Sequence, residues 1–140
     1  MDYTIQEFEK INDSRGDLVV FLKSDELKEQ DRTFGQIYFV TFHGENQIRG
    51  EHYHKHWREW FGVVSGKILV RLKDVRTGEK EEIIIDADHS KYVRLETGPY
   101  VVHGFKSLSE YAAMINYANG MWSENDTFAH PLFNQEWDEE

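Results

Sequence analysis

The residues best suited to chemistry in this 140-residue chain are three histidines at alternate positions, His52, His54 and His56, followed by Glu59. Alternate side chains of a β-strand point to the same face, so we expect the three imidazoles to point one way and Glu59 to follow just after a bend. Imidazoles exchange protons near neutral pH and also bind metals. Two chemistries therefore stay open: acid–base catalysis without a metal, and a metal site made of imidazoles and a carboxylate.

A second segment, Gly98-Pro99-Tyr100-Val101-Val102-His103, places another histidine on a separate strand after a Gly/Pro turn. The pattern His52-x-His54-x4-Glu59, then six residues to Gly66, followed by this later histidine, has the order and spacing of the two cupin motifs. In a small jelly roll, two hairpins bring such segments face to face inside the barrel. The alternative interpretation is a strip of surface histidines on an exposed strand.

The composition limits the possible partners. The net charge is −10 and the sequence pI is about 5.1, so the chain repels phosphate backbones and we expect no nucleic-acid partner. A free nucleotide stays possible, because a few arginines can bind a diphosphate locally. The chain has no cysteine, which excludes disulfides and thiol catalysis. We find neither a signal-peptide pattern nor an apolar stretch long enough to span a bilayer, so we expect a cytoplasmic protein without membrane contact.

Short β-branched and aromatic runs separated by glycine-rich turns predict an all-β protein, a jelly-roll barrel or sandwich. The expected strands are residues 17–23, 34–42, 60–64, 67–72, 82–86, 91–95, 99–105 and 111–118, and one helix is expected at residues 24–31. We expect residues 1–140 to form a single domain. The acidic segment 123–140 is poor in strand signal, but its apolar residues indicate a tail that packs on the barrel: Phe128, Leu132, Phe133 and Trp137.

Three blocks of sequence resemble the nucleotide-sugar 3,4-ketoisomerases, which are RmlC-like cupins acting on dTDP-4-keto-6-deoxyglucose. The blocks are Asp13-Ser14-Arg15-Gly16-Asp17-Leu18, Arg49-Gly50-Glu51-His52-Tyr53-His54-Lys55 and Gly98-Pro99-Tyr100-Val101-Val102-His103. The resemblance extends from about residue 5 to residue 120. It implies an isomerase, an intramolecular oxidoreductase that moves a carbonyl between C4 and C3 of the hexose without a metal or cofactor. It also implies a homodimer with exchanged N-terminal strands and a product used in deoxysugar and lipopolysaccharide biosynthesis.

The same resemblance assigns the proton transfers to His52 and His54 and places Arg49 and Tyr38 in their pocket. We take His52 as the base at C3 and His54 as the proton donor at C4, with the two roles exchangeable, because an imidazole with a pKa near about 6.5 works in both directions. Arg49 would stabilise negative charge on the enediolate oxygen. The other candidates for substrate binding are Arg15, Arg71, Lys73 and Arg94 for the diphosphate, Tyr100 or Tyr117 for the thymine ring, and His103 and Glu59 beside the histidine pair.

Three other functions remain open at this point. A metal-dependent cupin enzyme, either a dioxygenase or an isomerase, would use His52, His54, Glu59 and His103 as ligands. A deoxysugar 3,5-epimerase is suggested by Asp74-Val75-Arg76-Thr77-Gly78, but Asn119-Gly120-Met121-Trp122 stands where those enzymes often carry a Tyr-Tyr pair. A sugar-binding cupin without catalytic activity is the third alternative.

Overall fold

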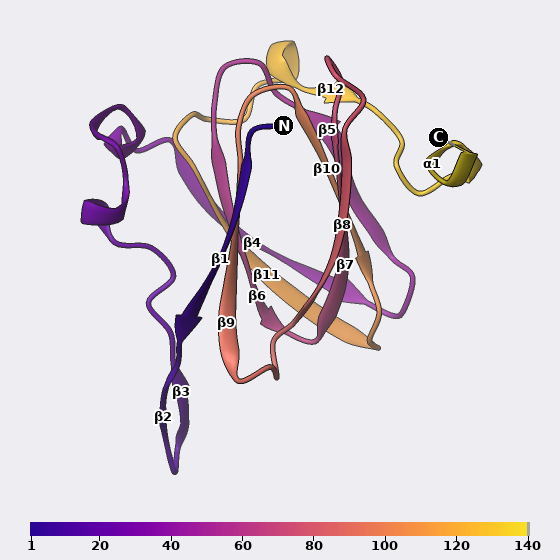
Figure 1. Cartoon of the computed structure of the whole chain (residues 1–140). Helices are drawn as coiled ribbons and strands as arrows, with labels where there is room; N and C mark the ends of the chain where they lie inside the picture. Colours follow the sequence, from indigo (N-terminus) through magenta and orange to yellow (C-terminus); the bar gives the residue numbers. More distant parts are fainter. Residues whose placement is uncertain (140) are drawn as a thin grey trace.

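The computed structural model describes residues 1–139, and two five-stranded antiparallel sheets face each other in it as a flattened barrel (Figure 1). The predicted all-β jelly roll is therefore confirmed. The first sheet has the order β1 (Tyr3–Glu9), β9 (Lys91–Thr97), β6 (Glu59–Ser65), β11 (Tyr111–Ala118) and β4 (Gln36–His43). The second has the order β12 (Phe128–Ala129), β5 (Ile48–Tyr53), β10 (Val101–Ser107), β7 (Lys67–Asp74) and β8 (Lys80–Asp86).

The remaining elements are short. A hairpin of β2 (Ile11–Asp13) and β3 (Gly16–Leu18) extends away from the barrel (Figure 1). Three 3-10 turns, η1 (Ser24–Glu26), η2 (Glu29–Arg32) and η3 (Glu124–Asp126), and a terminal helix α1 (Gln135–Glu139) complete the chain. Within residues 1–139, no helix is long and apolar enough to cross a membrane.

The core lies between the two sheets and follows the two-residue alternation of the strands. On β7, Ile68, Val70 and Leu72 are at most 1 % exposed, whereas the residues between them are only partly buried. Phe61 of β6 in the opposite sheet and Phe105 of the neighbouring strand β10 belong to the same core, with ring centroids 5.0 Å apart. Burial of each such side chain contributes about 1.5–3 kcal/mol. This packing fixes the inner faces of the strands that carry the candidate site.

Two expected elements near the N-terminus differ from the prediction. The strand expected at 17–23 ends at Leu18, and the helix expected at 24–31 is replaced by η1 and η2 with an extended residue, Lys28, before η2. A helix this short is marginal without tertiary packing. Here the guanidinium of Arg94 instead binds the carboxylate of Glu26 and the carbonyl oxygen of Phe21, which holds the segment in an irregular path over the first sheet.

The C-terminal segment crosses the second sheet. β12 pairs with β5, and Leu132 is only 1 % exposed. The guanidinium of Arg71 lies over the rings of Phe133 and Trp137, 4.9 and 4.8 Å from their centroids. The tail segment 123–139 is therefore held against the barrel along much of its length, and the last residue of the expected tail, Glu140, lies outside the described residues.

Candidate active site

A β-bulge in β5 sets which side chains of this strand face the barrel interior. Opposite β10, His52 pairs with His103 and Gly50 with Gly104, so Glu51 is the extra residue. Gly50 and Glu51 both have positive φ angles, 79° and 58°. Because one inserted residue shifts the two-residue alternation by one, Arg49 comes to the same side of the strand as His52.

Gly50 has no room for a side chain. A Cβ atom at this position would lie 2.7 Å from the carbonyl oxygen of His103 and 3.3 Å from the ring of Phe105. Its φ of 79° is also one that glycine adopts without strain. The Arg-Gly pair of the sequence block is therefore explained by the bulge: the glycine allows β5 to approach β10 closely while the arginine turns toward the cavity.

Residues from both sheets line one inner cavity of about 140 Å³: Tyr38, Val40, Arg49, Gly50, His52, His103, Phe105 and Met114. Arg49 lies at its more exposed side, where its Nε donates a hydrogen bond to the carbonyl oxygen of Thr41 at 3.1 Å. Burial raises the pKa of Tyr38, and the nearby Glu59 raises it further, so the phenol stays protonated. The cavity thus combines a neutral hydroxyl, a cation and two imidazoles between apolar walls.

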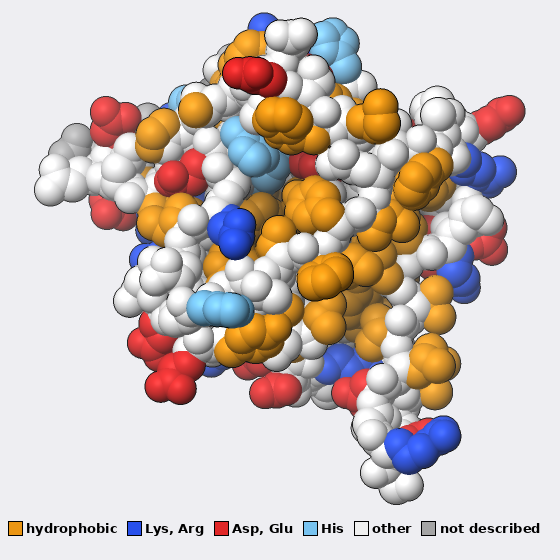
Figure 2. Space-filling model, turned by 180° about the vertical axis from the view of Figure 1, so that it is seen from behind, with side chains coloured by type: hydrophobic (Ala, Val, Ile, Leu, Met, Phe, Trp, Pro, Cys, Tyr) orange, Lys and Arg blue, Asp and Glu red, His pale blue; other side chains and the backbone are white. Residues whose placement is uncertain are grey.

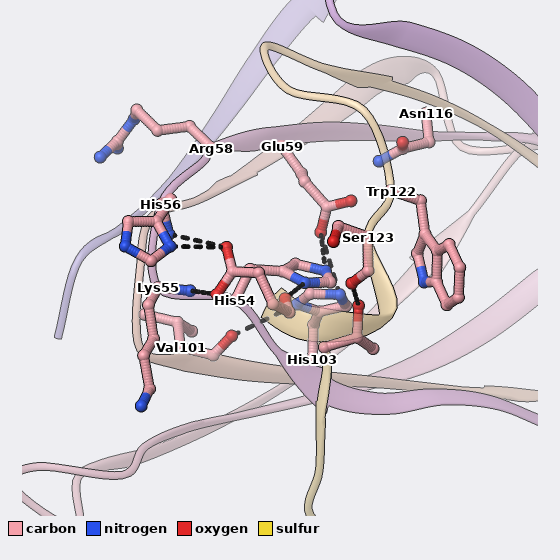
Figure 3. A network of polar contacts seen from close by, with 12 residues as sticks. His54, Lys55, His56, Arg58, Glu59, Val101, His103, Asn116, Trp122 and Ser123 are labelled. Carbon is pink, nitrogen blue, oxygen red and sulfur yellow. Dashed lines mark hydrogen bonds and ion pairs between the residues drawn. The ribbon is translucent and has the colours of Figure 1, made fainter.

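Three imidazoles and one carboxylate converge beside this cavity, and Figure 3 shows two of these imidazoles, His54 and His103, turned toward Glu59. One ring nitrogen from each of His52, His54 and His103 lies within 4.8 Å of the others. Oε2 of Glu59 is 3.0 Å from Nε2 of His103 and 3.6 Å from Nε2 of His54. Glu59 is only 4 % exposed, so this carboxylate is surrounded by the histidines and the protein interior.

Backbone carbonyls determine which nitrogens face Glu59. Nδ1 of His54 lies 2.7 Å from the carbonyl oxygen of Asp126, and Nδ1 of His103 lies 3.3 Å from that of Val101. A carbonyl oxygen only accepts, so both Nδ1 atoms carry a hydrogen and both Nε2 atoms are the ring positions turned toward Glu59. Nε2 of His103 and Oε2 of Glu59 are close but have no hydrogen-bond partner among residues 1–139. Either a proton or a metal cation between these atoms would satisfy them.

The cluster also changes the proton affinity of its members. Burial, together with His103 and His54, lowers the pKa of His52 to about 4. Burial lowers the pKa of His54 as well, against the opposing effect of Glu59. Burial alone would raise the pKa of Glu59, but the surrounding imidazoles outweigh it and the net pKa is lowered. His52 is therefore a neutral imidazole at neutral pH and is available as a base.

The expectation that His56 shares the face of His52 and His54 is wrong. β5 ends at Tyr53, and the chain bends at Lys55 and His56. The side chain of His56 is 79 % exposed, and its Nδ1 lies 3.1 Å from Oδ2 of Asp126. The alternation of a strand does not continue through a bend, so only the first two imidazoles turn inward.

Most of the expected diphosphate ligands lie outside the cavity. Arg15 is at the tip of the β2–β3 hairpin, 88 % exposed, and pairs with Asp13 at 2.7 Å. Arg71 and Lys73 alternate with the buried residues of β7 and therefore lie on the outer face of the second sheet. Arg94 is buried on the outer side of the first sheet, bound to Glu26 and to residues of the N-terminal segment. Within the described structure, Arg49 is the cation that lines the cavity.

The tyrosines proposed for thymine differ in position. Tyr117 is buried on the outer side of β11, where its hydroxyl donates a hydrogen bond to the carbonyl oxygen of Asp31 at 2.9 Å. Its role in the described chain is to hold the η2 segment. Tyr100 is half-buried at the turn before β10 and stacks against Tyr53 with centroids 6.3 Å apart. Neither tyrosine lines the cavity that contains His52.

Several residues of the site carried little signal in the sequence. Phe105 lies two residues after His103 on one strand, so alternation indicates its inward direction. Met114 and Val40 enter from the first sheet, and their choice depends on how the two sheets face each other. Trp57 stacks on His54 with centroids 4.1 Å apart. Asp126 contacts His54 across 72 residues of sequence, and no local sequence pattern predicts that contact.

The two facing sheets and the inward cluster of three histidines and a glutamate define a cupin. The sequence profile of the polysaccharide biosynthesis C-terminal domain matches residues 11–129, and the chain belongs to that family. A comparison with curated protein sequences finds no match.

Solved structures show the same fold. The 3,4-ketoisomerase QdtA from Thermoanaerobacterium thermosaccharolyticum, in complex with TDP-4-keto-6-deoxyglucose, is 22 % identical with a TM-score of 0.75 and covers 99 % of this chain and 93 % of its own. The dTDP-4-dehydrorhamnose 3,5-epimerase of Bacillus anthracis is 19 % identical with a TM-score of 0.82 over 96 % and 82 %. The capsular polysaccharide assembling protein CapF of Staphylococcus aureus is 25 % identical with a TM-score of 0.62 over 69 % and 26 %. The ketoisomerase and epimerase likenesses establish the fold but do not choose between the two reactions.

Proposed function

We propose that the protein is a sugar-nucleotide 3,4-ketoisomerase that moves the carbonyl of a dTDP-4-keto-6-deoxyhexose from C4 to C3. The observation that carries this proposal is the joint placement of a neutral His52, Arg49 and Tyr38 in one inner cavity. A ketoisomerase and epimerases that act on such nucleotide sugars share the fold, and the family takes its name from polysaccharide biosynthesis. The expected place of action is the cytoplasm, in the supply of deoxysugars for surface polysaccharides such as lipopolysaccharide.

In net terms, the reaction removes a proton from C3 and adds one to C4, and it removes a proton from O3 and adds one to O4. His52 takes the proton from C3, the electrons of that bond form the C3–C4 double bond, and the His52 imidazolium gives its proton to O4, which completes the enediol. His52 then takes the O3 proton as the C3 carbonyl forms, while C4 takes the proton held by the neighbouring histidine–glutamate set. Transfer of the proton from His52 to that set, across rings whose centroids are 4.9 Å apart for His52 and His103, restores both groups. One hydrogen is lost from C3 and one is gained at C4, so no external oxidant or reductant is required. A positioned imidazole contributes about 10²–10⁴-fold to each such transfer.

Two groups beside His52 complete the proposed machinery. Arg49, at the exposed side of the cavity, is placed to stabilise the enediolate oxygen or the first phosphate of the substrate. His54 does not line the cavity itself, whereas His103 does. The proton donor to C4 is therefore assigned to the linked set of His54, Glu59 and His103, with His103 as the member that faces the substrate.

The proposal includes a homodimer in which N-terminal strands are exchanged. The outer face of the first sheet exposes Ile37, Phe39 and Val64, which are 58 %, 77 % and 63 % exposed, and Figure 2 shows hydrophobic side chains gathered in patches over one face of the molecule. A cavity of about 320 Å³, larger than the histidine cavity, lies between the N-terminal segment and the barrel, where Asp17, Phe21, Val64, Ile85 and Tyr92 are among the residues that line it. Ile11 and Leu18 of the extending hairpin are 62 % and 56 % exposed. Contact with a second copy would cover these apolar surfaces and would bring Arg15 toward a neighbouring site.

The deciding experiment follows dTDP-4-keto-6-deoxyglucose by NMR in D2O in the presence of the untagged protein. A 3,4-ketoisomerase moves the carbonyl signal from C4 to C3 and exchanges the transferred proton. A 3,5-epimerase labels C3 and C5 while the carbonyl stays at C4, and a non-catalytic binder labels neither. His52→Asn is expected to abolish turnover while dTDP binding, measured by calorimetry, is retained. Unchanged turnover in this variant would remove His52 from the chemistry.

The convergence of imidazole nitrogens beside the Glu59 carboxylate favours one second candidate, a metal-dependent cupin isomerase or dioxygenase. The four residues that would hold a divalent metal are His52, His54, His103 and Glu59, a set of imidazoles and one carboxylate that suits iron, manganese or nickel. A bound cation would supply Lewis-acid polarisation of a substrate oxygen. Elemental analysis of the untagged protein, before and after chelation, separates this candidate from the first. Stoichiometric metal whose removal and return abolishes and restores activity would support it.

A further inference from the structure

Asp126 contacts three consecutive residues of the histidine segment, His54, Lys55 and His56, whose polar contacts are drawn as dashed lines in Figure 3. Its backbone carbonyl oxygen accepts a hydrogen bond from Nδ1 of His54 at 2.7 Å. Its carboxylate accepts from the backbone N–H of Lys55 at 2.8 Å and from that of His56 at 3.1 Å. The residue is only 7 % exposed, so one buried aspartate of the C-terminal segment is bound to the end of the strand that carries the site.

These contacts determine the tautomer of His54. Because a carbonyl oxygen cannot donate, Nδ1 of His54 must carry the hydrogen, and Nε2 is left with a lone pair directed toward Glu59 at 3.6 Å. The carboxylate of Asp126 has a second effect, since it holds the bend at Lys55 and His56 at which the strand ends. The carbonyl of Asp126 can reach the imidazole only while this bend keeps its position.

The C-terminal segment is fixed to β5 at two places after Asp126, which holds this residue in position. Two residues after it, Phe128 pairs with Tyr53 of β5 and stacks on its ring with centroids 5.2 Å apart. Further along, Oε1 of Glu51 accepts hydrogen bonds from the backbone N–H groups of Leu132 and Phe133 at 3.0 and 3.1 Å. The strand of the histidines and the tail therefore hold each other in register.

We propose that Asp126 is a positioning residue of the candidate site: it fixes His54 as the Nδ1–H tautomer, with Nε2 directed at Glu59, by anchoring the C-terminal segment to the bend after β5. This inference rests on the proposed function for its effect on turnover, while the tautomer itself is independent of any activity. It assigns the segment after the barrel, residues 123–129, a place in the site and not only in the packing of the fold. Groups that orient a functional imidazole typically change activity or metal affinity about 10- to 100-fold when they are removed.

The test compares Asp126→Ala and Asp126→Asn with Glu124→Gln, a matched control in the same 3-10 turn whose side chain is exposed. Two-dimensional ¹⁵N–¹H NMR of histidine-labelled protein reports the tautomer of His54, and steady-state kinetics with dTDP-4-keto-6-deoxyglucose report turnover. In the wild type and in Glu124→Gln, we expect His54 to be wholly the Nδ1–H form. In Asp126→Ala we expect a mixture of tautomers and a kcat lower by about 10- to 100-fold with KM changed much less.

Each outcome decides the question. An Nε2–H tautomer in the wild type overturns the proposal without any variant, and so does an Asp126→Ala protein that keeps a pure Nδ1–H form and wild-type kcat. If Asp126→Ala does not fold, as circular dichroism would show, Asp126→Asn serves, because it retains one acceptor oxygen and is expected to lie between Asp126→Ala and the wild type in both readouts. If the wild type does not turn over the sugar, the proposed function fails, but the tautomer measurement still confirms or refutes the role of Asp126.

Discussion

Replacing His52 with Asn should make the protein less sensitive to acid even though it removes the proposed base. The pKa of His52 is lowered from 6.5 to about 4 in the folded protein by burial and by the neighbouring imidazoles. A lowered histidine pKa means that the unfolded chain binds a proton at a pH where the native protein does not. The stability linked to His52 is therefore present above about pH 6.5 and is lost as the pH falls from there toward about 4.

The size of the effect follows from the two pKa values. Between about pH 7.5 and about pH 5, protonation of the unfolded chain at this one residue would cost about 2 kcal/mol of unfolding free energy if the shift were fully expressed. His52 is only partly buried, and solvent screening reduces this to about 1 kcal/mol. Glu59 and His54 titrate in both proteins, so their contributions largely cancel in the comparison.

The assay is urea unfolding of chelator-treated wild type and His52→Asn, followed by tryptophan fluorescence at about pH 7.5 and about pH 5. We expect the wild type to lose about 1 kcal/mol more stability than the variant between the two pH values. The slope of free energy against urea should be equal in the two proteins, which would show that the same surface is exposed on unfolding. Parallel loss of stability in both proteins would show that His52 is not a desolvated imidazole, and the reasoning about its role as a neutral base would fail.

Two further predictions test the bulge and the outer face. Gly50→Ala forces a Cβ to within 2.7 Å of the carbonyl oxygen of His103, so we expect it to lower the free energy of unfolding in urea by at least about 2 kcal/mol and the activity by about 10²-fold. The control is Gly78→Ala, which has a similar φ but open space around it and should lower stability by only about 1 kcal/mol with unchanged activity. Equal effects of the two substitutions would contradict the bulge argument. Phe39→Asp, on the outer face of the first sheet, should convert a dimer to a monomer in light scattering, whereas Ile84→Asp on the other sheet should not; a wild-type monomer would refute the dimer.

The sequence predicted the parts of the fold that depend on short-range alternation. The strands around Phe39, Ile68 and His103 follow from apolar residues at every second position, and the structure places strands there. It did not predict β1, five of whose seven residues are exposed and which is held by pairing with β9 along its length. A strand stabilised mainly by its neighbour carries little local signal, because tertiary pairing supplies what its own side chains do not.

For the candidate site too, the sequence predicted what depends on spacing along one strand and did not predict what depends on the direction of a sheet face. The placement of His52 and His54 on one face was visible from their spacing, as was the return of His103 on a later strand. Arg71 and Arg94 were expected to bind the diphosphate because of their charge alone, and the structure places both on outer faces of the sheets. A surface arginine and a ligand-binding arginine have the same local sequence, since only the direction of the strand face distinguishes them.

By itself, the sequence determined that the chain is built of β-strands and that His52 and His54 share one face of a strand, since alternation along a single strand is a local property. The tertiary structure alone decided three things: that a bulge at Glu51 turns Arg49 inward, that His56 turns outward at a bend, and that Asp126 orients His54. Each of these depends on backbone groups from strands far apart in sequence, whose hydrogen-bond partners exist only after the sheets and the tail have come together.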